Sequence, residues 1–367
     1  MKKVCHMTSG HNSNDTRIFY KECVSLVSLG FDVYLIAGGK DKFDCGVHII
    51  GIQSDNCGRL KRIINKTRKV YKKAIDINAD IYHIHDPELM FYALKLKRKN
   101  KVVIFDVHEN YLKMISKKNW IPKLLQGTVQ KIYNYFEKRI LSKLDAIITV
   151  SPNITASYKK INPETYTITN YPIILKKKRI VKTRKSNVIC FAGGITEQWC
   201  QEEIIKALGI KRNYRYKLIG NCSEEYLNKL KALEGFRYVD YLGVLSHDQT
   251  INELEESDIA VALLEYSMNT ENKQGTLGNT KLFEAMSVGL PVICTNFLYW
   301  EKIIEKYNCG LCIQPHNVES IVNALNYFDN YKQSELMGKN ALIAVQNDLN
   351  WETQESILKK IYEKFEK

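Results

Sequence analysis

The chain has 367 residues, of which 45% are hydrophobic and 26% are charged, and its formal net charge is +14. This length and this apolar content suit two globular domains better than one. No apolar run reaches the roughly 18 residues of a membrane-spanning helix, and the first residues, MKKVCHMTSGHNSND, lack the apolar stretch of a signal peptide.

In the first half of the chain, short apolar runs alternate with longer amphipathic runs. The runs expected to form strands are KKVCHMTS, DVYLIAGG, VHIIGIQ, DIYHIHD, VVIFDVHE and AIITVS. Helices are expected between most of them, for example at 16–29, 59–77 and 122–142. Strands that alternate with helices indicate a parallel sheet covered by helices on both faces.

The second half repeats this pattern after a charged segment. Its expected strands are VICFAGG, YKLIG, YVDYLG, DIAVALLE, PVICT and CGLCIQP. We therefore predict an α/β protein of two Rossmann-like, doubly wound domains, residues 1–172 and 187–350, joined by a basic linker at 173–186. Because ligands of such sheets bind at the carboxyl ends of the strands, the residues just after each strand are the candidates for a site.

The loop after the first strand is rich in small polar residues, including Gly10 and His11, and leads into a helix. A helix N-terminus is a natural anion site. Arg17 lies in the first turn, which is an unfavourable position for a cation unless it faces an anion. A plain helix capped by Asn14 or Asp15 explains the same residues equally well.

The fourth and fifth strands end in histidines and acids. His83 and His85 lie on one face of their strand, with Asp86 next, but no metal-ligand partners at suitable spacing are evident, so a structural or substrate-positioning role is expected. His108 and Glu109 follow the fifth strand, where a histidine could hydrogen-bond a substrate or shuttle a proton.

In the second half, Gly193 and Gly194 end the first strand and let a ligand approach the backbone. A later loop, which includes Gly278, Asn279 and Thr280, runs into a helix whose amides could hold a phosphate beside Lys281. There is neither a P-loop nor a DxD at a strand end, so we expect no metal-held diphosphate and no metal cofactor.

Glu284 lies in that short helix, in the stretch NTKLFEAMSVGLPVICTN. The acid of a capping box is the third residue after the cap, whereas Glu284 is the fourth after Thr280 and the fifth after Asn279, so it does not fit a capping box. Local sequence leaves open whether Glu284 is a solvated side chain or a ligand-binding one.

Taken together, these segments resemble the retaining glycosyltransferases of family 4 (group 1), which have the GT-B architecture. The resemblance runs through NDTRIFYKECVSLVSLGFDVYLIA, HIHDPEL, FDVHENY, Asn170-Tyr171-Pro172, FAGGI, KLFEAMSVGLPVI and the terminal helix at 351–367. It covers essentially the whole chain, and Lys281–Ile293 is its strongest motif.

The resemblance implies an acceptor-binding N-terminal domain and a C-terminal domain for a nucleotide-sugar donor, facing across a cleft, with the last helix packed back on the first domain. It implies that Glu284 binds the donor ribose, that Lys281 faces the diphosphate and that His108 acts beside the transferred sugar. Gly10 and His11 match the loop near the diphosphate and the acceptor.

Two departures from the family pattern concern the donor site. Many members carry a glutamate eight residues before the ribose glutamate, where this chain has Thr276. Members also often carry Arg or Lys in the loop after the glycine pair, and residues 195–200, ITEQWC, contain neither. Lys281, Arg17 and backbone amides are then expected to hold the phosphates.

Three functions remain open. The first is retaining transfer of a hexosyl or related sugar to a lipid-linked or glycan acceptor, in the synthesis of a cell-surface polysaccharide of capsule or O-antigen type. The second is a catalytically weak relative that binds a nucleotide-sugar and supports a partner enzyme. A nucleic-acid binder is the third, but RNA-binding aromatic signatures are missing.

The positive charge is concentrated in the first half. Residues 1–175 hold 29 Lys+Arg against 15 Asp+Glu, residues 176–186 add seven cations, and residues 187–367 hold 18 against 25. The segment at 59–77 combines many cations with an apolar helical face formed by Leu60, Ile63, Ile64, Val70, Tyr71 and Ala74. We therefore expect a cytoplasmic protein that binds peripherally to the anionic inner face of the cell membrane.

Overall fold

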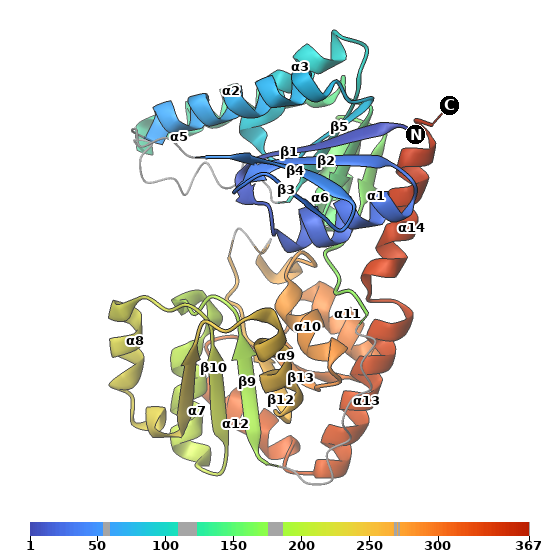
Figure 1. The fold of residues 1–367 in the computed structure, drawn as a ribbon. Coiled ribbons are helices and arrows are strands. Elements are labelled where there is room, and N and C mark those ends of the chain that lie inside the picture. Colours follow the sequence, from blue (N-terminus) through green and yellow to red (C-terminus); the bar gives the residue numbers. More distant parts are fainter. Residues whose placement is uncertain (54–58, 109–122, 175–185, 268–269, 271, 367) are drawn as a thin grey trace. The chain divides into compact units, whose positions relative to one another are not determined.

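The computed structural model describes residues 1–53, 59–108, 123–174, 186–267, 270 and 272–366, and divides them into two compact units. Unit 1 is Met1–Asn170 with Trp351–Lys367, and unit 2 is Tyr171–Asn350. Each unit has its own sheet and its own helices (Figure 1). Most of the predicted basic linker lies outside the described residues.

Unit 1 is built on an eight-stranded sheet of order β3-β4-β2-β1-β5-β6-β7-β8, which is parallel except for the pair β3–β4. Its strands are β1 (Lys3–Asn12), β2 (Asp32–Gly38), β3 (Lys42–Asp44), β4 (Val47–Ile52), β5 (Ile81–Ile84), β6 (Val102–Val107), β7 (Ala146–Thr149) and β8 (Thr165–Thr167). The short strands β3 and β8 were not predicted, because three-residue strands carry little periodicity.

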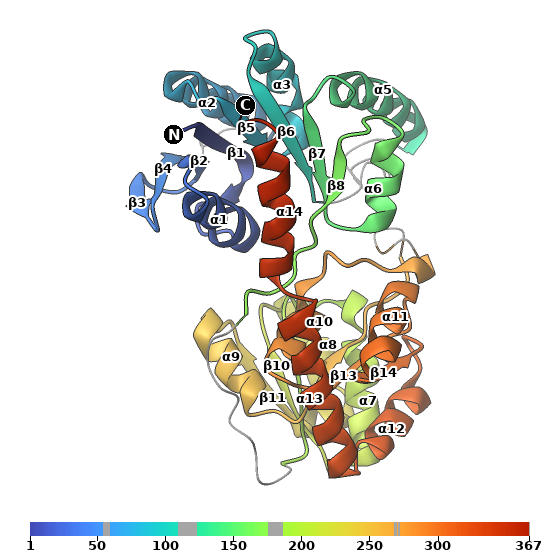
Figure 2. The same ribbon diagram turned by 90° about the vertical axis from the view of Figure 1, so that its right-hand side faces the viewer.

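Helices cover both faces of this sheet, as the alternation predicted (Figure 2). They are η1 (Thr16–Cys23), α1 (Val24–Ser28), α2 (Arg59–Ile77), η2 (Pro87–Leu89), α3 (Met90–Lys97), α5 (Lys123–Leu141), α6 (Pro152–Lys159) and α14 (Trp351–Glu363). Successive residues of β1 enter different cores: Cys5 and Met7 pack under α2, α3 and α5, whereas Val4 packs with η1 and α14.

The predicted helix at 16–29 is two elements, a π-helix, η1, followed by α1. The C-terminal helix α14 belongs to unit 1: Trp351 Nε1 donates to Ser25 Oγ at 2.9 Å, and Gln354 Oε1 accepts from the Thr169 amide at 2.8 Å. Its apolar residues Leu358 and Ile361 are fully buried or nearly so.

Unit 2 is built on a six-stranded parallel sheet of order β11-β10-β9-β12-β13-β14. Its strands are β9 (Val188–Ala192), β10 (Arg215–Ile219), β11 (Val239–Gly243), β12 (Ile259–Ala262), β13 (Val292–Thr295) and β14 (Gly310–Ile313). Numbered within the unit this is 3-2-1-4-5-6, the strand order of dinucleotide-binding Rossmann domains. The prediction of two Rossmann-like domains is confirmed.

The helices of unit 2 enclose one large apolar core that includes Phe283, Phe297 and Trp300. They are η3 (Glu197–Trp199), α7 (Gln201–Lys211), α8 (Glu224–Lys231), η4 (Glu234–Tyr238), α9 (His247–Glu255), η6 (Asn272–Gln274), α10 (Thr280–Ser287), α11 (Leu298–Tyr307), α12 (Val318–Tyr327) and α13 (Tyr331–Asn347).

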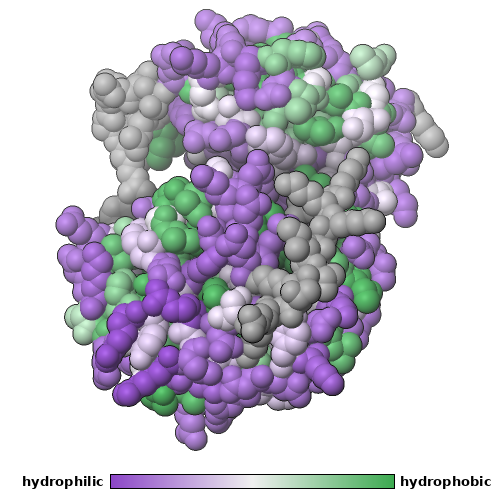
Figure 3. Space-filling model, turned by 60° about the horizontal axis from the view of Figure 1, so that its bottom comes forward, coloured by the Kyte–Doolittle hydropathy of each residue, from purple (hydrophilic) through white to green (hydrophobic). Residues whose placement is uncertain are grey.

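On the face shown in Figure 3, hydrophilic side chains predominate and apolar ones occur in small separate groups.

Candidate active site

Each sheet has a switch point, where successive connections begin to run in opposite directions. It lies between β1 and β5 in unit 1 and between β9 and β12 in unit 2. Ligands of doubly wound sheets bind outside the carboxyl ends of the strands at this point. In unit 1 the predicted site residues lie in the last part of β1 and after β5 and β6. In unit 2 they follow β9 and β12, so both groups lie at or next to a switch point.

Asp86, just after β5, holds the last part of β1, which leads into the loop at 13–15. Its Oδ2 accepts from Thr8 Oγ1 at 2.7 Å, from the Ser9 amide at 2.6 Å and from the Gly10 amide at 3.1 Å. A Cβ at Gly10 would lie 2.8 Å from Asp86 Oδ1, so a larger residue would displace this carboxylate. Asp86 therefore positions the backbone of this part of β1.

Asp15 is the N-cap of η1, one of the two caps that the sequence suggested. Its Oδ1 accepts from the amides of Arg17 and Ile18, both at 2.9 Å, and its Oδ2 lies 2.9 Å from His11 Nδ1. This hydrogen bond raises the pKa of His11. The last part of β1 and the loop after it are thus fixed by a carboxylate at each end.

Arg17 does not project from this loop as a phosphate ligand would. Only 4% of it is exposed, and its Nε and Nη2 donate to Asp106 at 2.8 and 3.0 Å while Nη1 donates to the Ile168 carbonyl at 3.0 Å. Asp106 is therefore the anion that compensates for the unfavourable position of Arg17 in the first turn of the helix. The structure corrects the assignment of Arg17 to the diphosphate: it is a buried structural cation.

His108 follows β6, and 17% of its side chain is exposed. Its Nε2 lies 3.0 Å from Asp106 Oδ2 and 3.3 Å from His85 Nδ1. Burial favours a neutral Asp106, but the charge of Arg17 and the hydrogen bond to His108 outweigh it and hold the pKa of this carboxyl well below its usual range. A charged Asp106 fixes the His108 ring with Nδ1 left for a ligand, since no described residue hydrogen-bonds that atom. Glu109 lies outside the described residues.

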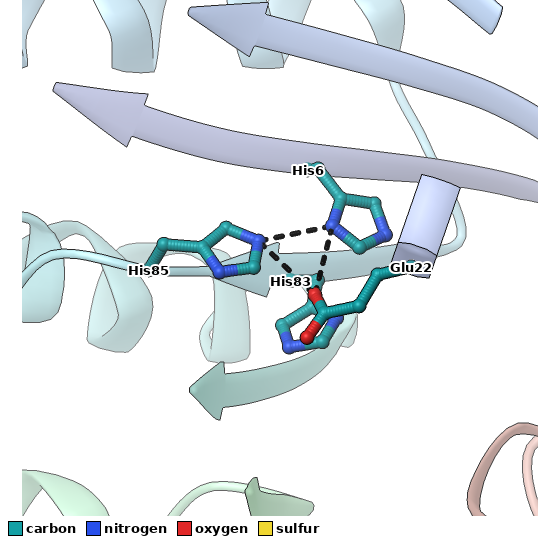
Figure 4. Close-up of side chains that lie close together, drawn as sticks. All are labelled: His6, Glu22, His83 and His85. Carbon is teal, nitrogen blue, oxygen red and sulfur yellow. Dashed lines mark hydrogen bonds and ion pairs between the residues drawn. The ribbon is translucent and has the colours of Figure 1, made fainter. Parts of the chain in front are cut away.

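Two neighbours of His83 and His85 were missed by sequence reasoning. His6 Nδ1 lies 3.0 Å from His85 Nε2, and Glu22 Oε2 lies 3.8 Å from the same nitrogen (Figure 4). All four side chains are fully buried. The pairing of β1 with β5 is the signal that could have found His6, whereas Glu22 depends on the π-helical turn of η1, which the sequence does not indicate.

In unit 2, Lys281 lies across the end of β9. Gly193 has φ +152°, and a Cβ there would stand 1.8 Å from Lys281 Cε, so glycine makes room for this side chain. Lys281 Nζ lies 4.7 Å from the centre of the Trp199 ring. Burial lowers the pKa of Lys281, against the charge of Glu284. None of the described residues forms a hydrogen bond or ion pair with this ammonium group.

The loop before α10 is held by polar contacts of its own. Asn279 is the N-cap and accepts from the Lys281 amide at 3.1 Å, and the Gly278 amide donates to Thr276 Oγ1 at 3.1 Å. Trp300 Nε1 donates to the Thr276 carbonyl at 2.9 Å. Thr280 is the first helical residue, and a Cβ at Gly194 would meet open space.

Glu284 is half-buried and lies three residues after Lys281 on the same helix, so both face the same side of α10. In the described parts of the chain no group donates a hydrogen bond to its carboxylate. The two side chains therefore offer an ammonium group and a carboxylate, about one helical turn apart, that unit 2 itself does not use.

Comparison with known proteins decides the family. Residues 17–170 match the family described as Glycosyltransferase Family 4, and residues 173–342 match Glycosyl transferases group 1. The chain belongs to the group 1 glycosyltransferases. No curated protein sequence matches this glycosyltransferase.

Solved structures share the GT-B fold of this glycosyltransferase over almost its whole length. Sucrose-phosphate synthase (tll1590) from Thermosynechococcus elongatus has a TM-score of 0.78 at 15% identity, covering 99% of each chain. A glycosyltransferase from Rickettsia africae ESF-5 has a TM-score of 0.72 at 16% identity, covering 99% of this chain and 98% of that one. HepE of Anabaena, in complex with UDP and glucose, has a TM-score of 0.73 at 13% identity, covering 99% of this chain and 100% of that one.

Proposed function

We propose that this glycosyltransferase transfers a hexosyl or related sugar, with retention, from a nucleoside-diphosphate donor to a lipid-linked or glycan acceptor. The observation that carries the proposal is the pair Lys281 and Glu284 on α10, beside the end of β9 and without a hydrogen-bond partner among the described residues. HepE of Anabaena, which has the same fold, is solved with UDP and glucose, which supports a nucleotide ligand here.

The chemistry of such a transfer assigns these groups distinct roles. The diphosphate gains negative charge as the anomeric carbon becomes oxocarbenium-like, and Lys281 with the N-terminal amides of α10 would stabilise it. Glu284 would accept from the two ribose hydroxyls. Because Lys281 supplies positive charge, the proposal requires no metal at the diphosphate.

Retention requires attack on the face that the leaving group departs from, or a protein nucleophile. The sequence offers no convincing nucleophile, so the proposal assigns the attack to the acceptor hydroxyl, assisted by the leaving phosphate. His108 Nδ1 would accept a hydrogen bond from a hydroxyl of the transferred sugar. Lys281 also offsets the cation-free loop at 195–200, which favours an active enzyme over a catalytically weak relative.

Replacing Glu284 with glutamine should weaken donor binding without changing the fold. The loss of one charge-assisted hydrogen bond corresponds to roughly 1.5–3 kcal/mol, or about ten- to a hundredfold in affinity. Calorimetric titration with nucleoside diphosphates would measure it. The matched control is Glu319→Gln, an exposed glutamate in the first turn of α12. Equal affinity of wild type and Glu284→Gln would remove Glu284 from the ribose role.

We also propose that unit 1 binds peripherally to the anionic inner face of the membrane, where a lipid-linked acceptor of a capsule- or O-antigen-type polysaccharide would be found. The predicted apolar face of α2 is buried only in part: Val70 and Ala74 are in the core, but Ile63 and Ile64 are 37% and 63% exposed. Exposed apolar side chains therefore lie next to cations on this helix. None of the described helices meets the length and hydropathy of a membrane span.

Charge reversal on α2 should weaken membrane binding. Each Lys or Arg near an anionic surface contributes about 1 kcal/mol, so changing the exposed Arg68, Lys72 and Lys73 to Glu should abolish flotation with anionic vesicles at low salt. The control reverses three exposed lysines of unit 2, Lys231, Lys302 and Lys332. Equal flotation of wild type with neutral and anionic vesicles, or with neither, would contradict the proposal.

A further inference from the structure

Unit 1 contains a cluster of four ionisable side chains that the proposed transfer does not use as a set. His6 comes from β1, Glu22 from η1, His83 from β5, and His85 from the residue after β5. Each has 0% of its surface exposed. Charged and imidazole groups are rarely buried together without hydrogen bonds or a metal ion.

The fold brings these residues together on one side of the sheet. His6 and His83 are direct partners in the parallel pair β1–β5, with ring centroids 4.6 Å apart. His85 is two residues beyond His83 and so lies on the same side, again at 4.6 Å between ring centroids. The π-helix η1 packs over this side and turns Glu22 toward the rings (Figure 4).

The facing atoms lie at distances close to those of a metal coordination shell. His6 Nδ1 and His85 Nε2 are 3.0 Å apart, and Glu22 Oε2 is 3.9 and 3.8 Å from them. All four residues offer a ligand atom within 4.8 Å of the others. Zinc bonds of roughly 2.0–2.1 Å place tetrahedral ligand atoms about 3.3 Å apart, so shifts within side-chain rotation would complete the shell.

Neighbouring groups orient two of the imidazoles for metal binding. Tyr362 Oη lies 2.9 Å from His83 Nδ1, and Asp106 Oδ2 lies 3.5 Å from His85 Nδ1. A partner on Nδ1 leaves the lone pair of Nε2 for the cluster, and a carboxylate behind a histidine is a frequent arrangement around zinc.

The contacts among the described residues leave polar atoms of the cluster unsatisfied. His83 Nε2 and both carboxylate oxygens of Glu22 are buried without a hydrogen bond, although Arg17 Nε is 3.1 Å from Glu22 Oε1. A buried polar atom without a partner destabilises the folded state. A cation bound between the rings would give a partner to His83 Nε2 and to Glu22 Oε2.

We propose that His6, Glu22, His83 and His85 bind one divalent transition-metal ion, with zinc as the best fit, in a buried structural site of unit 1. Three imidazoles and one carboxylate suit zinc, whereas magnesium and calcium prefer all-oxygen shells. The site would hold β1, which also carries His11, together with β5 and η1. It does not depend on the proposed role of Lys281 at the diphosphate. The sequence predicted no metal, so the proposal departs from that expectation.

The first test measures zinc in the whole wild-type chain. Elemental analysis of protein purified without chelator, followed by chelator treatment and titration with Zn²⁺, should show one bound ion per chain. At a hundredfold excess over its dissociation constant, the ion should raise the melting temperature of a unit of this size by about 5–10 °C. No retained zinc and no binding on titration would overturn the proposal.

The second test identifies the ligands. Glu22→Gln and His6→Asn should lose the ion, whereas His316→Asn should keep it. This control disrupts the other described group with metal-like spacing outside this region, Cys200, Glu203 and His316. A folded Glu22→Gln that binds zinc as tightly as wild type would refute the assignment.

If these variants fail to fold, X-ray absorption spectroscopy at the zinc edge of the wild-type protein still identifies the ligands. We expect three imidazole nitrogens and one carboxylate oxygen around the ion. A sulfur ligand, or fewer than two imidazoles, would place the ion elsewhere and overturn the proposal.

Discussion

Replacing His108 with alanine should lower the turnover of donor about 10²–10³-fold, the usual cost of removing one hydrogen-bonding group that stabilises a transition state. The affinity for the nucleoside diphosphate should change little, because the ribose and diphosphate groups are assigned to Glu284 and Lys281. This separation of effects follows from the position of His108, whose Nε2 is held by Asp106 at 3.0 Å and whose Nδ1 is left for a sugar hydroxyl.

Steady-state kinetics with a saturating acceptor would measure this effect, with donor binding followed separately by calorimetry. His48→Ala is the control, since His48 is 48% exposed and stacks on Tyr34 near the start of β4, away from the carboxyl ends of the strands. A His108→Ala enzyme with turnover within twofold of wild type would show that His108 does not contact the transferred sugar. Equal losses in turnover and donor affinity would indicate a structural role instead.

Replacing Arg17 with methionine should destabilise unit 1 by about 3–5 kcal/mol, the range for breaking a buried ion pair by removing one partner. Arg17 is 4% exposed, and without it Asp106 would remain a buried carboxylate that has lost the guanidinium hydrogen-bonded to both of its oxygens. Methionine keeps the volume of the side chain, so the effect reports the charge rather than a cavity.

Hydrogen exchange of the β1 and β6 amides would measure the local free energy of opening, with the β9 amides as an internal reference. The control is Lys42→Met, which removes a cation from the exposed pair Lys42–Asp44 and should cost under about 1 kcal/mol. Unchanged exchange in β1 and β6 of Arg17→Met would mean that this ion pair contributes no net stability.

The sequence predicted most strands because parallel strands buried on both faces are short apolar runs. VICFAGG became β9, which is two residues shorter, and PVICT became β13, which is one residue shorter. The expected strand ends placed His11, His108 and Gly193 among the candidates, whereas the strand order and its switch points come from the structure. The π-helix η1 was not predicted, because its eight residues have the same apolar spacing as an α-helix.

Partners that are distant in sequence account for what could not be predicted. Arg17 was predicted to bind phosphate because its buried partner could not be recognised from the sequence. That partner, Asp106, is 89 residues away and lies in β6. His6 and Glu22 were not connected with His83 for the same reason. By contrast, the capping contact between Asn279 and the Lys281 amide spans only two residues. Contacts of such short range can be predicted from the local sequence.

The central claim is that this glycosyltransferase consumes a nucleotide-sugar with retention, and the most direct test is an NMR time course of the anomeric proton. Purified protein would be incubated with nucleotide-sugars in which a hexose is α-linked to UDP, GDP, ADP or dTDP, and a membrane extract would supply the acceptor. We predict that one donor is consumed and that the first product is α-linked, with consumption slowed in Glu284→Gln. No turnover of any donor by folded protein, or a β-linked first product, would contradict the account.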